Sequence, residues 1–172
     1  MKFQVILADP PWRYNYSKSK SRKIENNYPT MSIDDICKLN IGSIVDEDCI
    51  LFLWTTAPKL EEAFKVINSW GFKYKTGMIW NKKKMGLGYY SRIQHEHILI
   101  ATKGKIKPPE PAVRPRSIIE KWWTKKHSEK PIEMYEIIEK MYPDKNKIEL
   151  FSRAARSGWS NWGNEISTNI IL

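Results

Sequence analysis

A rigid acidic turn follows the first apolar run of the chain. Residues 3–8 are mostly aliphatic, and Asp9-Pro10-Pro11-Trp12 comes directly after them. The run predicts a buried strand, which the prolines end because they fix φ and donate no ladder hydrogen bond. The Asp9 carboxylate and the Pro10 carbonyl can accept two N–H bonds, and Trp12 can stack on a ring. This chemistry suits a flat base with an exocyclic amine, although an ordinary strand-to-turn junction is the alternative interpretation.

Positive charge is concentrated near aromatic residues. The formal net charge is +10, which favours a polyanionic partner through phosphate contacts. Five cations follow the acidic turn, among tyrosines: Arg13, Lys18, Lys20, Arg22 and Lys23. Basic residues interleaved with aromatic rings are typical of proteins that bind nucleic acid with unstacked bases. A basic surface without a partner is the alternative.

Strand and helix patterns alternate along the chain. The patterns predict a single domain over residues 1–172, with strands at 3–8, 49–54, 72–80, 95–102 and 147–151. Helices are predicted to begin after an N-cap at Ser32, to span 56–70, and to run from Pro131 through Met141. Loops are expected at 13–27 and 81–92, and residues 104–116 form a proline-rich connector. This alternation predicts an α/β protein with a parallel, doubly wound sheet.

The metal-binding and sulfur-containing residues give little sign of a metal or a disulfide. His95 and His97 would share one face of a strand, but no third ligand follows them, so we expect no metal site. Cys37 and Cys49 lie in apolar segments and are expected to be buried free thiols. The sequence has no apolar run of membrane length and no signal-peptide pattern, so we expect a cytoplasmic protein without a membrane partner.

Six further short motifs follow the acidic turn in a fixed order. They are Tyr28-Pro29-Thr30-Met31-Ser32, Leu51-Phe52-Leu53-Trp54, His95-Glu96-His97-Ile98-Leu99, His127-Ser128-Glu129-Lys130-Pro131, Ile148-Glu149-Leu150-Phe151-Ser152-Arg153 and Trp162-Gly163-Asn164. From about Phe3 to Glu165 the set resembles the MT-A family of N6-adenine methyltransferases. The resemblance implies a Rossmann-like fold. It also implies a methyl-transfer reaction that uses S-adenosylmethionine as cofactor. It also implies a permuted order, in which the Asp-Pro-Pro-Trp strand precedes the cofactor strand.

The resemblance also implies roles for individual residues. The catalytic residues would be Asp9, Pro10, Pro11 and Trp12, and the substrate-binding residues would include Tyr28 and Glu96. The run of positive charge, independently of the resemblance, predicts that the substrate is also bound by Arg13, Lys18, Lys20, Arg22 and Lys23. S-adenosylmethionine would be bound by Asp9, Lys130, Phe151, Arg153, Asn164 and Glu165. Relatives often have glutamine where this chain has Glu165, and this exchange replaces an amide donor with an acceptor. We expect residues 114–119 to hold the cofactor adenine.

Several alternatives remain open at the level of sequence. The favoured reaction is methyl transfer to N6 of adenine in nucleic acid, with DNA slightly ahead of RNA and the adenine flipped out or unpaired. The alternative is a catalytically silent subunit that binds nucleic acid within a methyltransferase complex. Related motifs also serve methylation of the cytosine amine or of protein glutamine. The sequence leaves the oligomeric state open.

Overall fold

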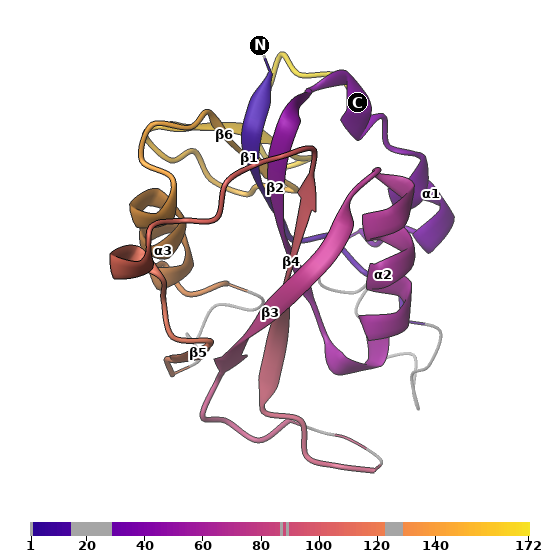
Figure 1. Ribbon diagram of the computed structural model, residues 1–172. Coiled ribbons are helices and arrows are strands. Elements are labelled where there is room, and N and C mark those ends of the chain that lie inside the picture. The colour runs from indigo at the N-terminus through magenta and orange to yellow at the C-terminus, as the bar shows by residue number, and fades with distance from the viewer. Residues whose placement is uncertain (1, 15–28, 87, 89, 123–128) are drawn as a thin grey trace.

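The computed structural model describes residues 2–14, 29–86, 88, 90–122 and 129–172 (Figure 1). Its strands are β1 (Phe3–Ala8), β2 (Val45–Thr55), β3 (Lys73–Asn81), β4 (His95–Lys103), β5 (Ile118–Glu120), β6 (Lys147–Leu150) and β7 (Trp159–Trp162). Its α-helices are α1 (Ile33–Lys38), α2 (Leu60–Ser69) and α3 (Glu133–Met141). Short 3₁₀ turns lie at Ile41–Ser43, Ala57–Lys59 and Pro111–Val113.

All of these strands form one mixed sheet in the order β5-β3-β4-β2-β1-β6-β7. The predicted α/β class is confirmed, and β1 precedes its neighbour β6 in the chain, in the predicted order. The prediction of a wholly parallel sheet was wrong for β4, which pairs antiparallel with both β2 and β3. Parallel neighbours need a long crossover connection, usually a helix. Residues 82–94 show no helix in their described part, and β4 returns beside β3 as in a hairpin.

Helices cover the two faces of the sheet separately. Helices α1 and α2 lie on one face and α3 lies on the other (Figure 1). On the first face, Val66 and Ile67 of α2 pack with Ile6. On the second, Met134 and Ile138 of α3 join a cluster of strand residues that are also buried. Because β1 and β2 contribute residues to both clusters, these strands are held between two apolar layers.

Local sequence signals account for the helix ends. Ser32 caps α1, with its Oγ accepting from the Asp35 amide at 3.1 Å, as predicted. Helix α2 is shorter than the predicted 56–70, since its first residues form a 3₁₀ turn. Gly71 ends it with φ +79°, a left-handed conformation that strains residues with a Cβ. The short strands β5 and β7 were not predicted, because neither shows a clear alternation of apolar and polar residues.

The two cysteines, His95 and His97 occupy ordinary positions in the sheet and helices. Cys37 and Cys49 are free thiols as predicted; Cys49 is buried and Cys37 only half-buried. Burial raises the pKa of Cys49 to about 12. His95 and His97 stack edge to face, with ring centroids 4.9 Å apart. The described residues contain no group of three or more potential metal ligands, and none of their helices could span a bilayer.

Candidate active site

The acidic turn is fixed by hydrogen bonds on both sides. The Asp9 amide donates to the Leu150 carbonyl of β6 at 3.4 Å, and the Pro11 carbonyl accepts from the Met31 amide at 2.9 Å. The Pro10 carbonyl accepts from the Trp12 amide at 2.8 Å. A carbonyl oxygen has two lone pairs, so this bond orients the Pro10 carbonyl and leaves capacity for a second donor.

Trp12 belongs to the protein core. It is only 4% exposed, and its indole N–H donates to the Trp54 carbonyl at 3.2 Å. It packs in the apolar cluster of the α1 and α2 face. This corrects the expectation that Trp12 stacks on a substrate base: the indole anchors the turn from within.

A lysine joins two carboxylates at the carboxyl end of β1. Lys130 Nζ lies 2.7 Å from Asp9 Oδ2 and 3.5 Å from Glu96 Oε2. Glu96 also accepts from Lys82 Nζ at 3.2 Å. Lys82 directly follows β3 and Glu96 lies near the start of the antiparallel strand β4, so both reach the same edge of the sheet as Asp9. The structure therefore brings together three residues that the sequence assigned to substrate or cofactor.

The two carboxylates are perturbed in opposite directions. Burial raises the pKa of Asp9 above its ordinary value, although the charge and hydrogen bond of Lys130 act against it. Burial also acts to raise the pKa of Glu96, but Lys130 and Lys82 outweigh it, so the pKa of Glu96 is lowered. Glu96 is thus the stably ionised partner that holds both lysines, while Asp9 is the carboxylate whose charge is costly to maintain.

Aromatic rings line the base of this charged cluster. Lys130 Nζ lies 5.5 Å from the ring centroid of Trp54, at the end of β2, and Lys82 Nζ lies 5.9 Å from that of Trp80. The two indoles meet edge to face with centroids 6.0 Å apart. Both indoles are buried, so the two lysines pack against fixed aromatic rings.

A cavity of about 490 Å³ opens beside Asp9 and extends along the end of β6. Its lining residues include Asp9, Lys130, Tyr135, Glu149, Phe151 and Arg153. Both acidic and basic side chains line the cavity, which suits a ligand with both an ammonium and a carboxylate group. Four of the six residues assigned to the cofactor from sequence therefore line one space.

The back of this cavity holds a hydrogen-bonded acid that the sequence analysis did not assign. Glu149 of β6 accepts from the Tyr135 hydroxyl at 2.6 Å and from the Ser152 hydroxyl at 2.9 Å. Burial raises the pKa of Glu149, although both hydrogen bonds oppose the shift, and burial likewise raises the pKa of Tyr135. An acid between the apolar residues Ile148 and Leu150 was the available signal, whereas nothing in the sequence marked Tyr135.

The turn after β6 replaces a glycine-rich loop. Phe151 has φ 64°, and the Ser152 amide donates to the Trp162 carbonyl at 3.0 Å. A Cβ on Gly163 would lie 2.3 Å from the Ser152 carbonyl oxygen, so only glycine allows this approach. Arg153 Nε lies 3.5 Å from Glu165 Oε1, and both side chains are exposed.

Some predicted residues lie apart from the cavity. Asn164 and Glu165 are exposed and are not among its lining residues, although Glu165 reaches it through Arg153. Arg13 is exposed, with Nε 3.4 Å from Thr30 Oγ1. The other proposed substrate residues lie outside the described part of the chain: Lys18, Lys20, Arg22, Lys23 and Tyr28.

Residues 114–119, which were expected to hold the cofactor adenine, lie far from the cavity beside Asp9. These residues lead into β5, at the opposite edge of the sheet from β6 and β7. Strands β3, β4, β2 and β1 separate them from the turn at Phe151. The proline-rich connector follows β4, so the position of β4 beside β3 directs it to that far edge.

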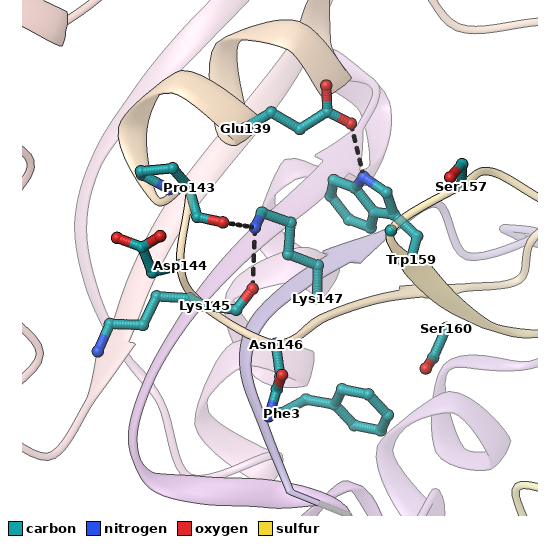
Figure 2. A pocket seen from close by; sticks show the side chains of 11 residues that line it. Phe3, Glu139, Pro143, Asp144, Lys145, Asn146, Lys147, Ser157, Trp159 and Ser160 are labelled. Carbon is teal, nitrogen blue, oxygen red and sulfur yellow. Dashed lines mark hydrogen bonds between the residues drawn. The ribbon is translucent and has the colours of Figure 1, made fainter.

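A second cavity, of about 640 Å³, lies at the amino end of β6 (Figure 2). Lys147 donates to the carbonyls of Pro143 and Lys145, at 3.0 Å and 2.8 Å. Glu139 accepts from the Trp159 indole at 2.8 Å. These bonds join the end of α3 to the sheet, which is a structural role.

The sheet order and the acidic turn define the class of a Rossmann-like methyltransferase. The MT-A70 family model matches residues 3–165, and the chain belongs to this family.

Three relatives illustrate the range of the family. The chain is 40% identical to the Type II methyltransferase M.MunI of Mycoplasma sp, over 99% of this chain and 80% of that protein. It is 30% identical to the N(6)-adenosine-methyltransferase catalytic subunit METTL3 of Homo sapiens, over 96% of this chain and 28% of that protein. It is also 30% identical to the N(6)-adenosine-methyltransferase MT-A70-like protein of Arabidopsis thaliana, over 96% of this chain and 24% of that protein. The chain thus spans most of the first relative and about a quarter of the other two.

Proposed function

We propose that this protein transfers a methyl group from S-adenosylmethionine to the exocyclic N6 amine of adenine in nucleic acid. The observation that carries the proposal is the Asp9 carboxylate, held at 2.7 Å by Lys130 beside the oriented Pro10 carbonyl and facing a cavity. The names of the relatives, which include adenosine methyltransferases, support the same chemistry.

The lining of the cavity fits S-adenosylmethionine. Lys130 and Arg153 would face the carboxylate of its methionine part, and Asp9 would face the ammonium group. Glu149, fixed by Tyr135, would accept from a hydroxyl group. When bound, the cofactor supplies an electrophilic methyl group on a sulfonium sulfur.

The residues of the turn would activate and orient the amine. The lone pair of an adenine amine is delocalised into the ring, so the nitrogen is a poor nucleophile. Asp9 and the Pro10 carbonyl would accept hydrogen bonds from its two N–H groups, which favours a tetrahedral nitrogen with its lone pair aimed at the methyl group. Positioning both reactants in this way can contribute roughly 7–11 kcal/mol to lowering the barrier. Lys130 keeps the Asp9 carboxylate in place, and Asp9 or water takes the proton.

In this proposal the polymer substrate is nucleic acid, and DNA is slightly favoured over RNA. A comparison of DNA with RNA in one assay decides this order. The target adenine would be unpaired or flipped out, because Asp9 lies in a recess beside a cavity.

A nucleoside assay tests the proposed function directly. The full chain is incubated with labelled S-adenosylmethionine and with matched DNA or RNA oligonucleotides, single- and double-stranded, and the products are digested and analysed by mass spectrometry. We expect N6-methyladenosine or its deoxy form. Cofactor binding by calorimetry without any methylated nucleoside would instead support a silent binding subunit, and methylcytosine would contradict the choice of adenine.

The cations after the acidic turn are the proposed contacts to the phosphate backbone. Replacing Lys18, Lys20, Arg22 and Lys23 with alanine should raise the dissociation constant for nucleic acid. Each lost phosphate contact should lower the slope of log affinity against log salt by ~0.7–0.9. Calorimetry should show an unchanged dissociation constant for S-adenosylmethionine. An unchanged salt slope would mean that nucleic acid follows another path.

A further inference from the structure

A third cavity, of about 620 Å³, lies on the α3 face of the sheet and shares no lining residue with the cavity beside Asp9. Its floor consists of Ile50, Met78 and Ile100, from three neighbouring strands. Met141 and Tyr142, at the end of α3, form one wall. The volume is in the range of small-molecule sites, and the floor is apolar, as in most such sites.

The proline-rich connector keeps this cavity open. Pro108, Pro109 and Pro115 line it from above, and prolines make the segment stiff. Two hydrogen bonds fix the connector: the Tyr142 hydroxyl donates to the Lys107 carbonyl at 3.3 Å, and Arg114 Nε donates to the Pro109 carbonyl at 3.0 Å. The connector is thus fastened to α3 and to itself, so the cavity is preformed.

The described charged side chains that line the cavity are both cations. Its lining includes the exposed cations Lys75 and Arg114, and no aspartate or glutamate is among the described residues that line it. The hydroxyl groups of Thr76, Thr102 and Ser117 add polar contacts. The cavity therefore has an apolar floor and a cationic rim.

We propose that this cavity binds a small organic anion with an apolar body. The body would lie on the aliphatic floor, where burial of apolar surface stabilises it, and the anionic group would lie between Lys75 and Arg114. Because Arg114 Nε is held by Pro109, its terminal amino groups are oriented to donate to a carboxylate or phosphate. A carboxylate of hydrocarbon type and a mononucleotide share this chemistry, and the aliphatic floor favours the carboxylate.

Fluorescence of anilinonaphthalene sulfonate, an aromatic anion, tests the proposal on the full chain. We expect saturable binding to the folded protein that excess S-adenosylmethionine does not displace. Displacement by decanoate identifies a hydrocarbon carboxylate as the source, and displacement by adenosine monophosphate identifies a nucleotide. Displacement by neither compound would overturn the proposal.

Three variants locate the site. Thr76→Trp fills the cavity from an exposed strand position, where tryptophan is well tolerated, and should abolish probe binding. Lys75→Gln combined with Arg114→Gln should weaken decanoate binding about tenfold or more, since two charged donors are lost. Lys73→Gln, an exposed cation outside the cavity, is the matched control and should leave binding unchanged. Near-ultraviolet circular dichroism checks that each variant is folded, and folded variants that all bind like the wild type would refute the site.

Discussion

The two ends of strand β6 hold two lysines that are almost equally buried and serve different purposes. At the carboxyl end, Lys130 is bonded to the carboxylates of Asp9 and Glu96 beside a cavity. At the amino end, Lys147 is bonded to two backbone carbonyls, and burial lowers its pKa (Figure 2). Carbonyls that a helix end leaves unpaired are a natural partner for a lysine, so Lys147 is explained by the fold alone.

The cluster around Lys130 has no such explanation, because its partners are carboxylates rather than backbone carbonyls at a helix end. It places two acids near each other and near a cavity, and one of them, Asp9, has a raised pKa because it is buried. Such an arrangement costs free energy in the free protein, which is typical of functional sites. The comparison teaches that the kind of partner distinguishes the two lysines better than their burial does.

The largest expected effect is at the carboxyl end. Asp9→Ala should lower the rate of methyl transfer at least ~100-fold, because it removes the carboxylate that we propose as acceptor for the amine N–H groups. Asp144→Ala, at the amino end, should keep the wild-type rate. Single-turnover kinetics with saturating oligonucleotide measures both. More than a tenth of the wild-type rate in folded Asp9→Ala would refute the assigned role.

Substitutions of Lys130 and of Lys147 should also differ in their effect on the affinity for S-adenosylmethionine. Lys130→Ala should raise the dissociation constant of S-adenosylmethionine about 10- to 150-fold, the value of a charged hydrogen bond of roughly 1.5–3 kcal/mol. Lys147→Met should not change it. Isothermal titration calorimetry gives both constants, and equal effects of the two variants would remove the distinction between the two ends.

The free energy of unfolding should depend on Lys147, at the amino end of β6, although cofactor affinity should not. Lys147→Met keeps the apolar stem but removes two hydrogen bonds to backbone carbonyls, which should lower the free energy of unfolding by about 2 kcal/mol. Lys145→Met, at an exposed side chain of the same turn, should change it by less than about 0.5 kcal/mol. Urea titrations with fitted m-values decide between a structural Lys147 and an inert one.

The smallest expected effects concern two glutamates with opposite pKa shifts. The pKa of Glu149 is raised by burial, so its favourable contribution is complete below its ordinary value of 4.5 and is lost as the pH rises through the folded-state value. The pKa of Glu139 is lowered by its hydrogen bond to Arg156, so its contribution is present above 4.5 and is lost as the pH falls. Glu149→Gln should therefore gain stability relative to the wild type with rising pH, and Glu139→Gln with falling pH. Melting temperatures across the pH range would contradict this if both variants shifted in the same sense.

The sequence predicted the carboxyl end of the sheet better than the rest. Asp9, Lys130, Phe151 and Arg153 line one cavity, as their motifs implied, because each follows or precedes a strand or helix with a clear pattern. Trp12 was misread because a tryptophan beside a catalytic turn looks the same in sequence whether it faces a ligand or the core. Its burial depends on packing against α1 and α2, which no local pattern encodes.

The course of the proline-rich connector was also beyond a reading of the sequence. The composition of residues 104–116 predicted a stiff segment, but its direction depends on the antiparallel placement of β4. That placement follows from a link between β3 and β4 whose described residues form no helix, and this is a feature of topology. Residues 114–119 were therefore expected beside the cavity, although they lie at the other edge of the sheet. The contact of Tyr135 with Glu149 was missed because it too depends on how the chain packs, here α3 on the sheet.

The position of β1 next to β6 has a consequence for how the protein is made. The ribosome delivers Asp9 early, yet its amide pairs with Leu150 and its carboxylate with Lys130, both of which emerge much later. Until then β1 has β2 on one side and an open edge on the other. Pairing between segments far apart in sequence is slow, and open strand edges invite association between chains. We therefore expect the nascent chain to need protection by a chaperone until the segment that carries Lys130 and Leu150 has folded, and activity to appear only after that.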